Sequence, residues 1–146
     1  WRKWNLATSL SSIQLDVMND QNGLLDFEEM EVWQDAQDLA VEIYDDLSQV
    51  RDYSFSDQLK RASVSISNNV AEGAERETDT DFARFLDIAK GSTGEVRSMY
   101  RLGVRLEHFN KETADRRTKQ CTHISKQLAG FARYLRKRNR KAGLSH

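Results

Sequence analysis

Residues 55–73 read FSDQLKRASVSISNNVAEG, and they carry the contact pattern of one helix in a bundle. The residues that form this pattern are spaced alternately three and four apart: Phe55, Leu59, Ala62, Ile66, Asn69 and Gly73. Such spacing places them along one face of an α-helix, as in helices that pack at shallow angles. The segment is therefore predicted to be a bundle helix with small and polar residues in its contact face.

Three more segments show the same spacing. In residues 33–50 the contact positions are Trp33, Ala36, Ala40, Ile43, Leu47 and Val50. In residues 82–106 they are Phe82, Phe85, Ala89, Ser92, Val96, Met99, Gly103 and Leu106. In residues 114–135 they are Ala114, Cys121, Ile124, Leu128, Phe131 and Leu135. The 146-residue chain contains no proline, which favours long uninterrupted helices.

Helix-start signals precede each segment. A capping oxygen stands three residues before a carboxylate in three places, Asp26 with Glu29, Ser54 with Asp57 and Thr78 with Asp81, and Asn110 can cap the last helix. Leu25 and Met30 are spaced for a hydrophobic staple. The connections left over, around 51–53, 73–77 and 108–110, are short, so neighbouring helices are expected to run antiparallel. The predicted fold class is all-α, an antiparallel up-down-up-down four-helix bundle.

One domain accounts for the chain. We predict that residues 26–146 form the bundle with a basic C-terminal tail. We interpret residues 1–25 as an extension, non-native or disordered in part, and we leave residues 1–17 out of functional reasoning. The single cysteine, Cys121, cannot form an internal disulfide and is expected to be a small buried apolar residue. No apolar run approaches the roughly 20 residues of a membrane span, which predicts a cytoplasmic protein with no membrane partner.

Polar residues interrupt the contact faces of the two central segments. The candidates for a structural polar network are Arg61, Ser65, Asn69, Glu72, Ser92 and Glu95, with Arg76 as a further partner. Such a network can fix helix register. The alternative is a small polar site with paired carboxylates at Glu72 and Glu95. A di-metal centre would need a Glu-x-x-His motif on each of two helices, and none occurs, so no metal site and no cofactor are predicted.

The same residues carry a family resemblance. The matching stretches are FEEMEVWQ at 27–34, QLKRASVSI at 58–66, NVAEG at 69–73, and 82–86 followed by AKGS at 89–92 and by Glu95. They resemble four-helix-bundle proteins first noticed as reading frames within intervening sequences of bacterial large-subunit ribosomal RNA genes. Ser67 stands where that family usually has proline. The resemblance implies a homopentameric ring of bundles, and a related protein is the accessory subunit of reverse transcriptases in diversity-generating retroelements.

The near-zero net charge hides a strong asymmetry. Residues 1–57 contain three basic and thirteen acidic residues, and no acidic residue follows Asp115. The cations of the last segment are Arg116, Arg117, Lys119, Lys126, Arg133, Arg136, Lys137, Arg138, Arg140 and Lys141, and Arg97, Arg101 and Arg105 add a basic ridge. This pattern is typical of a surface that binds phosphates, RNA above all. Alternatively, the cations pair within the bundle with acids at the start of the first helix, at Asp26, Glu28, Glu29 and Glu31.

Catalytic motifs are lacking: the sequence has no Gly-rich phosphate loop, CxxC, HExxH or nucleophile elbow. Two loose pairings, Arg101 with His108 and Arg117 with His123, resemble the Arg/His spacing of helical ribonucleases. A general acid or base also needs a partner placed by the fold, and the sequence identifies none. A ribonuclease using Arg101 and His108 is therefore a remote alternative.

These observations predict a non-catalytic bundle that assembles into a homo-oligomer, expected to be a pentamer, and acts as a binding or scaffold protein. The partner is expected to be RNA or an RNA-handling protein such as a reverse transcriptase. Assembly is suggested by apolar residues beyond one contact face: Val32, Leu39, Leu86, Ile88, Tyr100, Leu102 and Val104. The alternative is a purely structural homo-oligomer whose charges serve only subunit pairing.

Overall fold

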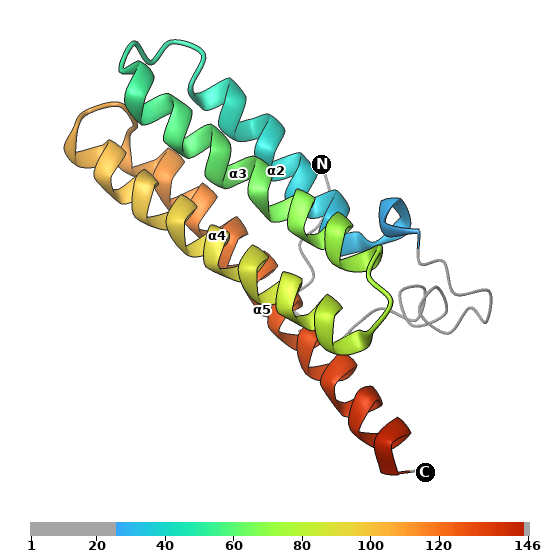
Figure 1. The fold of residues 1–146 in the computed structure, drawn as a ribbon. Coiled ribbons are helices and arrows are strands. Elements are labelled where there is room, and N and C mark those ends of the chain that lie inside the picture. The colour runs from blue at the N-terminus through green and yellow to red at the C-terminus, as the bar shows by residue number, and fades with distance from the viewer. Residues whose placement is uncertain (1–25, 145–146) are drawn as a thin grey trace.

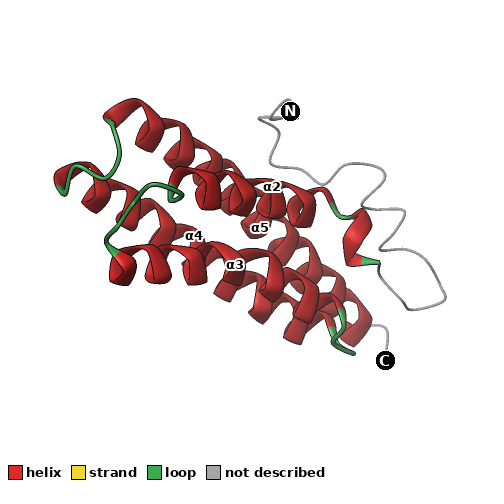
Figure 2. Ribbon diagram, turned by 90° about the horizontal axis from the view of Figure 1, so that it is seen from above, coloured by secondary structure: helices red, strands yellow, loops and turns green. Residues whose placement is uncertain are grey.

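A computed structural model describes residues 26–144 and shows an all-α four-helix bundle, as predicted. A 3-10 turn, η1 (Phe27–Glu29), precedes four helices: α2 (Glu31–Asp46), α3 (Tyr53–Ala74), α4 (Asp79–Arg105) and α5 (Lys111–Leu144). Successive helices are joined at alternate ends of the bundle, so neighbours along the chain run antiparallel (Figure 1). Figure 2 shows that residues 26–144 contain helices and short loops and no strand. The last turns of α5 project beyond the other helices.

The helix caps agree in part with the sequence signals. Thr78 accepts a hydrogen bond from the Asp81 amide, and Asn110 accepts one from the Thr113 amide, both as predicted. Asp26 caps η1 instead of α2, which begins after Met30 without a side-chain cap. The prediction of Ser54 as a cap is wrong, because α3 starts earlier and Asp52 accepts from the Phe55 amide. Leu25, the other half of the expected staple, lies outside the described residues.

The core runs the length of the bundle and is broader than a single contact row. Four of the residues assigned to an outer surface are buried in it: Val32, Leu39, Leu86 and Tyr100. The assignment was wrong because the buried stripe of a bundle helix includes positions beside the alternating three-four seam. Ile88 and Leu102 are exposed as expected, by 43% and 44%.

Two glycines allow α3, α4 and the following loop to pack closely. A Cβ atom on Gly103 would lie 2.4 Å from the Phe109 ring, and one on Gly73 would lie 2.7 Å from the Phe82 ring. Phe109 in turn stacks on Tyr100 with ring centroids 4.6 Å apart. A larger residue at either glycine would have to displace an aromatic ring, which explains why these seam positions are small.

The predicted polar network is brought together at its centre. Ser65 and Ser92 share a hydrogen bond of 2.9 Å between α3 and α4, and the Asn69 amide donates to Ser65. Glu72 instead pairs with Arg76 at 2.7 Å, at the exposed end of α3. Arg61 and Glu95 line an open groove beside these serines, and neither makes a hydrogen bond or ion pair within residues 26–144. The serine contact thus joins the two helices without a paired-carboxylate site.

Two further predictions concern Cys121 and membrane-spanning segments. Cys121 is fully buried, and burial raises the pKa of its thiol to about 12, so it packs as an apolar residue. None of the helices between residues 26 and 144 is long and apolar enough to cross a membrane.

Candidate nucleic-acid interface

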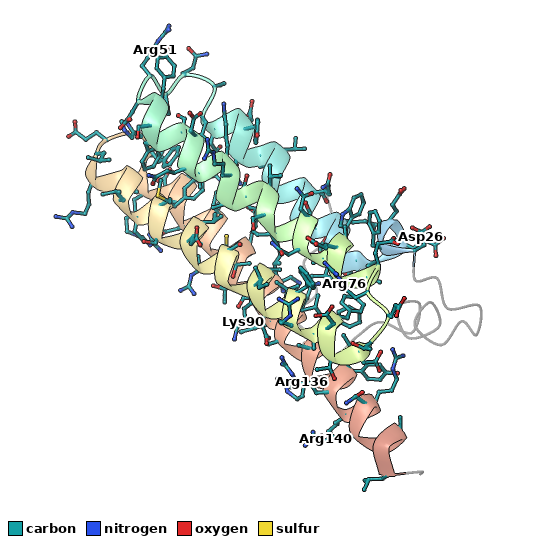
Figure 3. All side chains as sticks on the ribbon, in the orientation of Figure 1. Asp26, Arg51, Arg76, Lys90, Arg136 and Arg140 are labelled. Carbon is teal, nitrogen blue, oxygen red and sulfur yellow. The ribbon has the colours of Figure 1, made fainter. Side chains whose placement is uncertain are left out.

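The ten cations predicted from the last segment all lie on α5, but they are not equally available. Most are exposed: Arg116, Lys119, Lys126, Arg133, Arg136, Lys137, Arg140 and Lys141. Arg138 is half-buried and Arg117 is buried. Figure 3 shows Arg136 and Arg140 on the part of α5 near the C-terminus, with Arg51 at the opposite end of the bundle.

Four of the exposed cations form a regular row. Lys119, Lys126, Arg133 and Arg140 are each seven residues apart, and we call them the basic row. Seven residues are about two turns of helix, so successive members lie on one side of α5, about 10 Å apart. None of the four makes an ion pair with any residue in the described range 26–144. The row is therefore a line of available positive charge about 32 Å long.

A groove between α4 and α5 adjoins one end of the basic row. Arg97 and Arg101 of α4 and Lys119 of α5 line it, and its open volume is about 620 Å³. Its other lining residues are mostly small, Gly94, Ser98, Thr118 and Thr122, with Asp115 at one side. Arg101 is held by Asp115 at 2.8 Å and by Thr118 at 3.2 Å, whereas Arg97 makes no ion pair with a described residue. Arg97 and Lys119 are thus two uncompensated cations at one hollow.

The cationic end of α5 is partly neutralised within the bundle, but not where the sequence predicted. Arg136 pairs with Asp87, and Arg138 pairs with Asp79, both on α4. Within residues 26–144, none of the acids Asp26, Glu28, Glu29 and Glu31 forms the predicted ion pair with a cation of α5. The antiparallel bundle places the start of α4, like the start of α2, near the end of α5, and α4 packs against α5 far more extensively.

Arg117 points into the bundle and forms a buried ion cluster. Its guanidinium donates to Asp46 at 2.8 and 3.1 Å and lies 3.1 Å from Glu42, both on α2. Tyr100 also donates to Asp46, at 2.7 Å, and Gln120 donates to Glu42. Burial opposes the charge of Arg117, but the hydrogen bonds and charge of Asp46, together with Glu42, outweigh it and raise the pKa of Arg117. The cluster joins three helices, and because Arg117 is buried and paired with acids inside the bundle, it is not available to a phosphate.

The two residues of the ribonuclease alternative have separate partners. Arg101 is held by Asp115 and Thr118, while His108 lies 3.0 Å from Asp52, the residue that caps α3. The hydrogen bond with His108 holds the pKa of the Asp52 carboxyl below its usual range. No contact among the described residues joins Arg101 to His108. Residues 26–144 also contain no cluster of three His, Cys, Asp or Glu side chains that could hold a metal ion.

A family model described as "23S rRNA-intervening sequence protein" matches residues 28–130. The chain belongs to this family. A similar solved structure is that of a protein with unknown function from the S23 ribosomal protein family of Bacteroides thetaiotaomicron. It is 26% identical, with a TM-score of 0.65, over 69% of this chain and 97% of that chain. No curated protein matches the chain.

Two features of the interface were not predicted from the sequence. The seven-residue spacing of the basic row is visible in the sequence and could have separated its members from the other cations. The inward position of Arg117 has no local signal, because its acidic partner Asp46 lies 71 residues earlier in the chain. Neither family comparison gives a function for these residues.

Proposed function

We propose that this protein is a non-catalytic, oligomeric module that binds RNA through the basic row on α5. The observation that supports the proposal is the row itself: four exposed cations in line, none paired within residues 26–144. Lysine and arginine that neutralise phosphates release condensed counterions, which supplies most of the affinity of a surface that does not read sequence. The family description, which places such proteins in intervening sequences of 23S rRNA, is compatible with an RNA ligand.

RNA fits the basic row better than a protein such as a reverse transcriptase. Protein interfaces usually depend on a few apolar or aromatic anchors that fill pockets on the partner. Between Lys119 and Arg140 the row offers charge without such anchors, and the exposed large apolar side chain of α5, Leu144, lies one turn beyond its end. Two large apolar side chains that are exposed on α4, Ile88 and Leu102, and three on α2 and at the start of α3 are not part of the row.

Binding of RNA by the wild-type chain should weaken steeply with salt. If each member of the basic row neutralises one phosphate, the slope of log K against log salt should be about −3 or steeper. Filter binding with a labelled RNA over a range of salt concentrations measures this slope. Absence of binding at low salt, or binding that does not depend on salt, would refute the proposal. In that case the charges would be left to subunit pairing, the alternative role.

Self-association is the second part of the proposal. Besides Leu144 at the end of α5, the exposed large apolar side chains lie in two places: Val41, Tyr44 and Tyr53 on α2 and the start of α3, and Ile88, Leu102 and Leu106 on and just after α4. Two different patches suit a head-to-tail interface, which closes into a ring when the rotation allows it. The family resemblance implies a ring of five.

Light scattering on the purified protein should therefore give a mass well above that of one 16.9 kDa chain, with five copies as the expected state. Burying the apolar patches stabilises the assembly, so Val41→Asp together with Leu102→Asp should lower the measured mass. Lys90→Asp, an exposed change on α4 away from the apolar patches, is the control and should leave the mass unchanged. A wild-type mass of one chain would contradict this part of the proposal.

A further inference from the structure

The aromatic residues of α4 and α5 are buried or half-buried. Phe82, Phe85, Tyr100 and Phe131 are buried in the bundle. Tyr134 is half-buried, and the guanidinium of Arg138 lies over its ring at 5.6 Å. The exposed aromatic side chains of the described chain, Tyr44 and Tyr53, lie on α2 and at the start of α3. The face formed by α4 and α5 therefore has no exposed aromatic surface on which a base could stack.

A single strand of RNA would gain little on such a face. Proteins that bind single strands gain about 1–3 kcal/mol per base from stacking on aromatic side chains. Without that gain, a flexible strand must still lose conformational freedom when it aligns with a rigid row of charges. A double helix is already stiff, and it needs no stacking surface because its bases are stacked internally.

The density of phosphate charge also favours a double helix over a single strand. A duplex carries more phosphates per unit length than a single strand, and each contact releases about 0.9 counterion against about 0.7 for a single strand. The basic row presents its cations along one side of α5 over about 32 Å, with a drift of about 20° around the helix per seven residues. Such a line matches the regular backbone of a helix, and cations in it can contact phosphates without the ligand changing shape.

We propose that the RNA held by the basic row is double-helical, with one strand's phosphates anchored in the groove between α4 and α5 by Arg97 and Lys119. This proposal rests on the proposed function. It narrows the ligand to duplex RNA, which the protein would recognise through the RNA backbone. Arg97 and Lys119 come from different helices, line one hollow, and make no ion pair with a described residue. The hydroxyl of Ser98 lines the same hollow and can donate to a phosphate oxygen.

The test compares an RNA duplex of about 16 base pairs with each of its two separate strands. The sequence is chosen so that neither strand pairs with itself. Fluorescence anisotropy with the full chain should give a dissociation constant at least about tenfold lower for the duplex. An equal or tighter affinity for the single strands would overturn the duplex proposal while leaving RNA binding intact. Failure to bind any of these RNAs would overturn the proposed function as well.

A pair of variants tests the groove. Arg97→Gln with Lys119→Gln should weaken duplex binding by about tenfold or more, because two phosphate contacts are lost. The control, Arg51→Gln with Arg61→Gln, removes the same charge from the α2–α3 loop and from α3. It should leave the affinity unchanged. Equal losses in the two variants would overturn the assignment of the groove as the anchor.

Discussion

Replacing Arg117 with methionine is expected to lower the free energy of unfolding by about 3–5 kcal/mol. The substitution would keep most of the side-chain volume but remove the positive charge that Asp46 and Glu42 face inside the bundle. Both carboxylates would then be largely buried without a cation, and Asp46 would keep a hydrogen bond only from Tyr100 among the donors of the cluster. Urea denaturation followed by circular dichroism, with linear extrapolation, measures the change.

Arg116 provides a matched control one residue away. It is exposed on α5 and makes no ion pair within residues 26–144, so Arg116→Met should change stability by no more than about 0.5 kcal/mol. Adding Glu42→Gln and Asp46→Asn to Arg117→Met removes the uncompensated charges and should recover part of the loss. If Arg117→Met costs no more than Arg116→Met, the cluster does not stabilise the bundle.

The cluster also explains how α2 is held. Helix α2 packs mainly on α3 and touches α5 only sparsely. Its contacts with α5 include polar ones: Asp46 and Glu42 meet Arg117, and Asp35 accepts a hydrogen bond from Gln127 at 3.1 Å. Loss of the cluster should therefore loosen α2 before the other helices. Amide hydrogen exchange of Arg117→Met should show this as faster exchange in α2 than in α4.

Helix positions could be predicted because their causes are local. The three-four spacing and the missing proline identify the helices, and capping residues such as Thr78 and Asn110 identify two of their starts. The start of α3 could not be placed as well, since Ser54 and Asp52 are both good capping residues. Asp52 is also contacted by His108 from the α4–α5 loop, and this tertiary contact is not visible in the local sequence.

For the candidate interface, the sequence predicted the cationic composition of the last helix but not which of its cations are exposed and unpaired. The sequence shows that the last helix is cationic, but it does not distinguish Arg116 from Arg117. Only the packing of the four helices shows that Arg116 is exposed to solvent and Arg117 is buried. The same holds for the ion pairs of the tail. Both α2 and α4 begin with acidic residues, and only the extent of helix packing shows that Asp79 and Asp87 of α4 are the partners.

Neutralising the basic row should have the largest effect on RNA binding. Changing Lys119, Lys126, Arg133 and Arg140 to glutamine is expected to weaken RNA affinity about a hundredfold or more at low salt, because four phosphate contacts are lost together. The slope of log K against log salt should become shallower by about 3 for the same reason. The four side chains are exposed and unpaired within residues 26–144, so the bundle itself should keep its stability. Filter binding and urea denaturation of the same preparation measure both effects.

The control separates the position of the charges from their number. Changing Arg51, Lys60, Arg61 and Arg76 to glutamine alters the net charge by the same amount, but on α3 and its flanking loops. This variant should keep the wild-type salt slope, since no row contact is lost. Equal weakening in both variants would mean that overall charge, and not the row, attracts RNA. A row variant that binds RNA normally but loses its oligomeric mass in light scattering would instead assign these cations to pairing between subunits.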